Sequence, residues 1–70
     1  MAERLSNRLR ELRGERDLTQ AALAERVGVS RKTINTVENG VFIPSALLAL
    51  KLARALGVDV EAVFSLDEED

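Results

Sequence analysis

The sequence contains neither cysteine nor histidine. Without cysteine no disulfide can form, and without both residue types a zinc site with the usual nitrogen and sulfur ligands is not expected. A chain of 70 residues makes one small domain with little buried area. Its fold therefore needs support from efficient helix packing or from dimerisation. We expect no metal and no cofactor.

Long apolar runs are also missing. The longest is far shorter than the roughly 20 residues that span a bilayer. The first ten residues, MAERLSNRLR, are charged and lack the apolar core of a secretory signal. We expect a cytoplasmic protein. Catalysis is not expected, because a chain this short has no room for a walled pocket beside its core.

The net charge of −2 is unevenly distributed. Residues 1–40 hold eight Lys and Arg against six Asp and Glu, whereas residues 41–70 hold two against six. This asymmetry is compatible with one basic face and an acidic C-terminal tail. By itself it does not indicate a nucleic-acid partner.

The sequence pattern predicts an all-α fold, because apolar residues recur at helical spacing between start and stop signals. The expected helices cover residues 3–16, 20–27, 30–39, 46–56 and 60–66. The expected N-caps are Thr19, Ser30, Ser45 and Asp59, and the expected stops are Gly28, Asn39-Gly40 and Gly57. No segment alternates long enough to predict a strand. Residues 5–66 should form the core of a single domain, the first few residues should be disordered, and residues 67–70 should be a solvated tail.

Residues 20–40 have the features of a helix-turn-helix, in which two helices meet across a turn of three or four residues. Ala24 is small enough to allow close approach of the helices, and Gly28 can adopt the positive φ that the turn needs. The inner faces need apolar residues, which the sequence supplies at Leu23, Val27, Val29, Ile34 and Val37. We therefore expect helix 30–39 to lie in the major groove of DNA.

Most of the chain carries a recognisable pattern. It reads NRLRELRGERDLTQAALAERVGVSRKTINTVENG, followed by PS and by KLARALGVDVEAVF. This pattern resembles the lambda-repressor-like, Cro/CI-type (XRE) family of helix-turn-helix regulators, and in particular its short stand-alone members. The resemblance covers about residues 5–66. It implies a five-helix domain with a central helix-turn-helix that binds double-stranded DNA as a homodimer.

Four residues of helix 30–39 are candidates for base contacts. Arg31, Lys32 and Thr36 match the base-reading positions of that family, and Asn35 lies beside them. Arginine can bind O6 and N7 of guanine with two parallel hydrogen bonds, and lysine can reach the same acceptors. Thr36 could contact a thymine methyl group. The alternative is that these side chains only keep the helix face solvated.

Contacts to phosphate are expected from a second set of residues, namely Thr19, Gln20, Ser30, Thr33, Asn39 and Arg13. Gln20 opens a helix, whose N-terminal N–H groups attract anions, and the matching glutamine of the family contacts the DNA backbone. Ser30 and Asn39 could instead serve only as helix caps. Arg13 and Glu38 match a family salt bridge, which we interpret as structural first.

The loop at residues 41–43, Val-Phe-Ile, departs from the basic residues that many family members carry there. Phe42 could pack on sugar and phosphate, lie under the fourth helix or join a dimer contact. The candidate dimer interface comprises Phe42, Val60, Val63 and Leu66, with Ile43 as a further candidate. Val60 and Phe64 could instead complete the core of one copy.

The leading hypothesis is a sequence-specific DNA-binding regulator that acts as a homodimer on an inverted repeat, either as a repressor or as an activator. Its half-sites should lie about 34 Å apart, because both recognition helices must enter successive major grooves. The alternative is a protein-interaction module with the same fold, such as an antitoxin or accessory subunit. The acidic tail and the apolar loop favour that alternative slightly.

Overall fold

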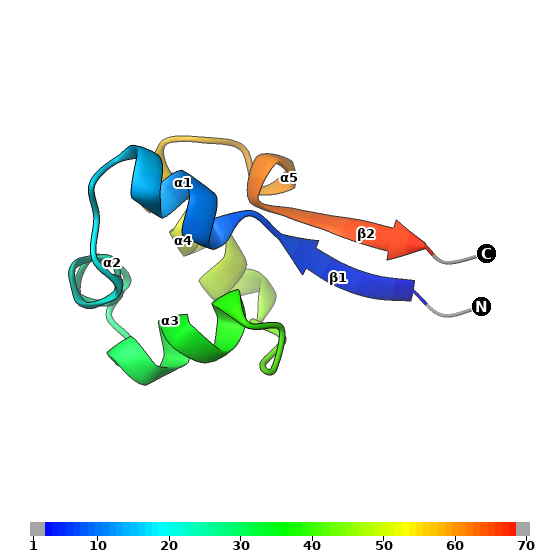
Figure 1. Cartoon of the computed structure of the whole chain (residues 1–70), viewed down its shortest axis with the longest axis horizontal. Helices are drawn as coiled ribbons and strands as arrows, with labels where there is room; N and C mark the ends of the chain where they lie inside the picture. Colours follow the sequence, from blue (N-terminus) through cyan, green and yellow to red (C-terminus); the bar gives the residue numbers. More distant parts are fainter. Residues whose placement is uncertain (1–2, 69–70) are drawn as a thin grey trace.

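The computed structural model describes residues 3–68, and Figure 1 shows their arrangement. The elements in chain order are β1 (Glu3–Asn7), α1 (Leu9–Glu15), α2 (Gln20–Val27), α3 (Arg31–Glu38), α4 (Ala46–Leu56), α5 (Val60–Val63) and β2 (Phe64–Glu68). The disorder expected at the N-terminus and the end of the expected acidic tail concern residues outside this range. No helix of the described part is long and apolar enough to cross a membrane.

Local capping sets the bounds of the middle helices, as the sequence predicts. The hydroxyl groups of Thr19, Ser30 and Ser45 each accept a hydrogen bond from a backbone N–H three residues on, at 3.0, 3.2 and 3.1 Å. Gly28 and Gly57 end α2 and α4 with φ values of 77° and 73°, a conformation that glycine adopts without strain. Asp59 precedes α5 as expected, but its side chain makes no capping hydrogen bond.

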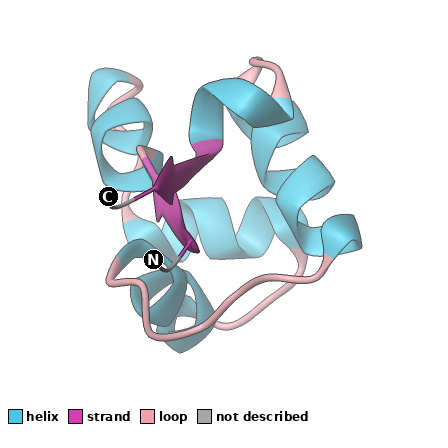
Figure 2. Cartoon of the chain, turned by 90° about the vertical axis from the view of Figure 1, so that its right-hand side faces the viewer, coloured by secondary structure: helices cyan, strands magenta, loops and turns pink. Residues whose placement is uncertain are grey.

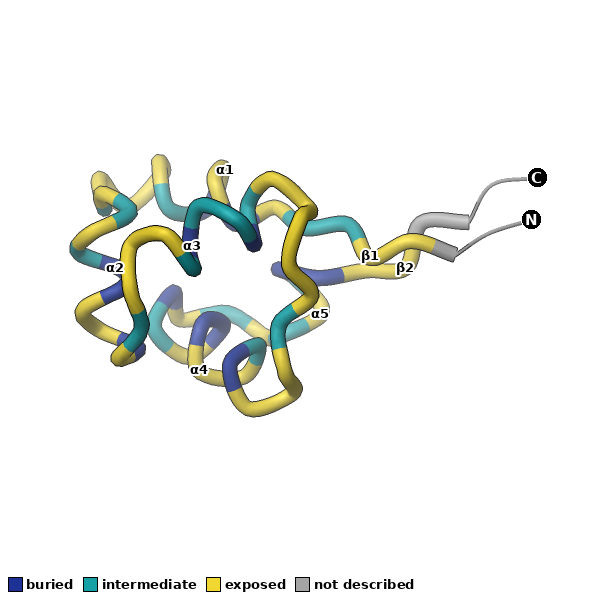
Figure 3. The backbone as a smooth tube through the Cα atoms, turned by 90° about the horizontal axis from the view of Figure 1, so that it is seen from below, coloured by how far each residue is buried: buried dark blue, intermediate teal, exposed yellow. Residues whose placement is uncertain are grey.

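The helices enclose one apolar core, which lies between α1, α2, α3 and α4 (Figure 3). Every helix contributes to it, as does the first residue of β2. The buried residues are Leu9, Leu12, Leu23, Ala24, Val27, Ile34, Val37, Leu48, Leu52, Ala53, Leu56, Val63 and Phe64. The five-helix prediction is confirmed, and Phe64 completes the core of a single copy.

The expectation of a chain without strands is wrong at both ends of the described part. β1 and β2 pair as an antiparallel ribbon in which Leu5 lies opposite Leu66. The first predicted helix therefore begins at Leu9 and the fifth ends at Val63. Residues 67–68 belong to β2, so the first two residues of the expected tail are part of a strand. Each strand has only five residues, and its partner lies at the other end of the sequence.

The ribbon projects from the helices (Figure 1) and points toward the viewer when the molecule is seen from that end (Figure 2). Asn7 fastens its base. The Asn7 Oδ1 atom accepts a hydrogen bond from the N–H of Leu9 at 3.0 Å, and Nδ2 donates to the carbonyl of Val37 at 3.0 Å. One side chain thus starts α1 and ties the ribbon to the end of α3.

Candidate nucleic-acid interface

The turn between α2 and α3 is closed by hydrogen bonds to a single carbonyl. The N–H groups of Gly28 and Val29 donate to the oxygen of Ala24 at 2.9 and 3.0 Å. Since α3 then buries Ile34 and Val37 against the core, its opposite side faces solvent. The helix-turn-helix predicted from the sequence is present.

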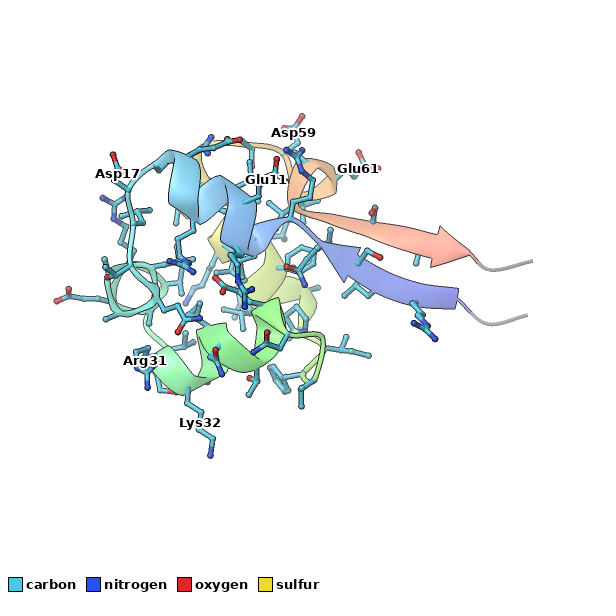
Figure 4. All side chains as sticks on the ribbon, in the orientation of Figure 1. Glu11, Asp17, Arg31, Lys32, Asp59 and Glu61 are labelled. Carbon is cyan, nitrogen blue, oxygen red and sulfur yellow. The ribbon has the colours of Figure 1, made fainter. Side chains whose placement is uncertain are left out.

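Arg31 and Lys32 occupy the first turn of α3, are exposed and extend away from the body of the domain (Figure 4). The Arg31 Nη1 atom donates to Oε1 of Gln20 at 3.3 Å. This contact steers the guanidinium along the outer face of the two helices. Both cations are therefore available to a ligand that lies against the start of α3.

Asn35 and Thr36, the other two base candidates, are half-buried. The Thr36 hydroxyl donates to the carbonyl of Thr33 at 2.9 Å. The Asn35 Oδ1 atom accepts from Gln20 Nε2 at 3.2 Å and from Asn39 Nδ2 at 3.3 Å. These two side chains offer less free hydrogen-bonding capacity than the two cations do.

A polar network around Glu38 connects α1, α2 and α3. The Glu38 side chain is 0% exposed, and Arg13 Nε donates to its Oε2 atom at 2.7 Å. Gln20 Nε2 donates to Glu38 Oε1 at 3.0 Å as well as to Asn35. The side chain of Gln20 is thus held between the two helices of the motif, and its Oε1 atom orients Arg31.

The charge of Glu38 is stabilised by its partners. Burial alone would raise the pKa of the Glu38 carboxyl, but hydrogen bonds from Arg13 and Gln20 and the positive charge of Arg13 outweigh burial. Together with a further hydrogen bond from Arg10 they hold the pKa below its ordinary value of 4.5. Glu38 is therefore an anion at neutral pH and fixes the orientation of the cations around it.

The predicted phosphate contacts fall into two groups. Thr19, Ser30 and Thr33 line the N-terminal ends of α2 and α3, and each also takes part in a capping hydrogen bond. Arg13 is different, because its side chain is only 17% exposed. Its three guanidinium nitrogens donate to Glu38 and to the carbonyl of Leu18. The structure thus brings Arg13 and Glu38 together and leaves Arg13 little capacity for phosphate.

Arg10 is a candidate that sequence reasoning missed. Its side chain is 66% exposed, and its Nη2 atom donates to Oδ1 of Asn39 at 3.1 Å. Its Nε atom lies 3.5 Å from Glu38 Oε1. Arg10 stands three residues before Arg13, and residues at this spacing share one face of a helix. That spacing was the signal that could have identified it.

The four candidate dimer residues differ in accessibility. Phe42 and Leu66 are exposed, Val60 is half-buried, and Val63 belongs to the core. Val63 could contribute to an interface only indirectly, by packing under the residues that contact the partner. Phe42 and Leu66 are therefore the two of this set that have surface to offer a partner.

The fold and this face are those of a helix-turn-helix domain, and comparisons with known proteins agree. A family model described as helix-turn-helix matches residues 9–63. An HTH-type transcriptional regulator from Methanothermobacter thermautotrophicus is 53% identical over 62 residues, which cover 87% of this chain and 90% of that protein.

Solved structures show the same likeness. The restriction-modification controller protein C.AhdI from Aeromonas hydrophila has a TM-score of 0.76 and 40% identity, covering 79% of this chain and 83% of that one. The P22 c2 repressor in complex with a synthetic operator has a TM-score of 0.74 and 33% identity, covering 77% of this chain and 82% of that one. The chain belongs to the helix-turn-helix family of DNA-binding transcriptional regulators. This membership points to a role other than catalysis.

Proposed function

We propose that the chain is a sequence-specific transcriptional regulator that binds an inverted-repeat operator as a homodimer. Each copy inserts α3 into the major groove of one half-site. The observation that carries this proposal is the first turn of α3, where Arg31 and Lys32 extend from a helix that is rigidly held by Glu38 and its partners. The operator complex of the related P22 c2 repressor supports it.

In this proposal Arg31 and Lys32 read base edges. The contact from Gln20 orients Arg31 before binding, which lowers the entropy lost when the guanidinium meets a guanine. Thr36 presents its methyl group, since its hydroxyl is engaged with Thr33. Asn35 positions Gln20 and Asn39, and it contacts a base only if one of these bonds breaks.

Phosphate contacts come from both ends of the motif. At the start of α2 and α3, Thr19, Gln20, Ser30 and Thr33 surround free backbone N–H groups, which favour anions. At the end of α3, Asn39 and the exposed Arg10 form a second contact. Phosphate contacts on both sides of the bases fix the register of α3 in the groove.

Random-site selection with the purified chain tests this function, followed by binding of the selected site to Arg31→Ala. We expect an inverted repeat with half-site centres roughly one helical turn apart. Arg31→Ala should relax the preference at one position per half-site and cost about 1–3 kcal/mol there. Competition electrophoretic mobility shifts with single-base variants measure this cost.

Lys51→Ala is the matched control, because Lys51 is an exposed cation on α4 and so lies outside the two helices of the motif. It should leave the sequence preference unchanged. A preserved preference in Arg31→Ala would contradict the base-reading role. Failure to select any site, together with a tight protein partner in a pull-down, would instead favour the interaction module, for which the exposed apolar loop is the supporting observation.

A further inference from the structure

The large apolar side chains that are exposed in the described molecule lie on three of its segments. They occupy the ribbon, the loop after α3 and the first half of α4, and they are Leu5, Leu66, Val41, Phe42, Ile43, Leu47 and Leu50. We call this set the apolar end. Soluble monomers rarely expose apolar side chains in such a group, and a patch of this kind indicates a binding surface.

The ribbon and the loop form one continuous part of this surface. Leu5 and Leu66 are paired directly across the ribbon, so their side chains lie on the same face. The next pair on that face includes Phe64, which is in the core. Leu5, Phe64, Phe42 and Ile43 line one small cavity at the base of the ribbon. The apolar surface therefore extends from the core edge outward along the ribbon.

The chemistry of this surface favours a second copy of the chain over a charged partner. Residues 39–50 contain no ionisable side chain, although 31% of the whole sequence is charged. DNA or a strongly charged protein would find no counter-charge in this segment. Two copies would meet without like-charge repulsion there. A standard interface takes about 800 Å² from each partner, and the large side chains of the ribbon and of residues 41–43, exposed between 37% and 77%, supply part of that area.

The position of the surface also fits a second copy. In Figure 1 the ribbon forms the right-hand end, and the loop lies at the right-hand end of α3, which runs along the lower side. Arg31 and Lys32 are at the far end of α3 from the loop (Figure 4). A partner at the apolar end thus leaves the start of α3 uncovered. Two copies placed side by side can turn both α3 helices toward the same DNA.

We propose that the apolar end is the surface through which two copies associate around a two-fold axis. The apolar face of the ribbon and residues 41–43 of one copy pack against the same residues of the other. The inference rests on the homodimer of the proposed function. It assigns the interface to Leu5, Leu66 and Ile43 with Phe42, in place of Val60 and Val63, which are less accessible.

Sedimentation equilibrium of the full chain without DNA tests this assignment. Leu66→Lys and Ile43→Lys each place a charge where the side chain is 66% or 72% exposed, so the core is unchanged and circular dichroism should match the parent chain. We expect the parent chain to be a dimer and each variant to raise the dimer dissociation constant by at least about tenfold, since a buried unpaired charge is costly. Ala21→Lys, which adds the same charge at an exposed position of α2, should leave that constant unchanged.

DNA binding provides a separate readout. Binding to an oligonucleotide with one half-site should be the same for Leu66→Lys and the parent chain, whereas the cooperative gain from a second half-site should be lost. An unchanged dissociation constant in either interface variant would overturn the assignment, as would a parent chain that stays monomeric. A parent chain that dimerises through this surface but selects no DNA site would refute the proposed function and leave the interface standing.

Discussion

Glu38 is the residue on which the orientation of the helix-turn-helix depends most. Its carboxylate accepts hydrogen bonds from Arg13 on α1 and Gln20 on α2, although it belongs to α3. A fully buried charge that lost a partner would have no water to replace it. The network therefore holds three helices in one arrangement, and its main contribution is to orientation.

The lowered pKa of Glu38 has a consequence for stability. A carboxyl whose pKa is lower in the folded state than in the unfolded state stabilises the fold above the unfolded value, which is 4.5 here. As the pH falls below that value, the unfolded chain takes up a proton first. The stabilisation is then lost progressively and disappears below the folded pKa.

We predict that Glu38→Gln lowers the free energy of unfolding by about 2 kcal/mol at pH 7, because the partly buried Arg13 loses its counter-charge. The difference from the parent chain should shrink as the pH falls below 4.5. Urea unfolding at pH 7 and at lower pH measures both effects. Arg8→Ala breaks the exposed pair between Arg8 and Glu11 and should lower the free energy of unfolding far less, because solvent screens an exposed ion pair. Equal losses of unfolding free energy in Glu38→Gln and Arg8→Ala would contradict the idea that burial makes the pair of Arg13 and Glu38 more important than an exposed pair.

At the scale of elements, the ends of the helices are determined by local chemistry. Gly28 ends α2 at φ 77° and lets the chain turn directly into the cap of α3. Gly14 is also a glycine, but it lies within α1 and a Cβ there would meet no atom within 4 Å. The two glycines therefore have opposite effects on stability when replaced by alanine.

We predict that Gly28→Ala destabilises the fold by roughly 1 kcal/mol, because an L side chain is strained at that φ. Gly14→Ala should stabilise it by roughly 0.5 kcal/mol, because alanine loses less backbone entropy in a helix. Thermal unfolding followed by circular dichroism compares the two variants with the parent chain. An unchanged or raised melting temperature for Gly28→Ala would show that the turn does not depend on the conformation of Gly28.

At the scale of the whole molecule, charge and apolar surface are separated. The exposed Arg31, Lys32 and Arg10 lie on α3 and α1, while the exposed apolar residues lie at the ribbon end. The net charge of −2 does not prevent DNA binding, because the field at the contacting face depends on the nearest charges. The salt dependence of DNA affinity should therefore be set by the few cations on this face.

We predict that Arg10→Ala weakens binding to every sequence by a similar factor and reduces the slope of log K against log salt concentration by about 1. Arg54→Ala removes an exposed arginine from the last turn of α4, outside the helix-turn-helix, and should leave the slope unchanged. Fluorescence anisotropy over a range of salt concentrations measures the slope. Equal slopes for the parent chain and Arg10→Ala would exclude a phosphate contact by Arg10.

The sequence by itself determined α2, α3 and α4, because Thr19, Ser30, Ser45, Gly28 and Gly57 act within a few residues of where they stand. The resemblance to the Cro/CI-type family indicated that Arg13 and Glu38 belong together. Only the tertiary structure decided the ribbon. The five residues of β1 and the five of β2 become strands by pairing with each other, and neither segment has a distinctive strand pattern in the sequence. The same holds for the contacts of Gln20 with Asn35 and Glu38, which are set by how α2 packs against α3 and not by spacing along one helix.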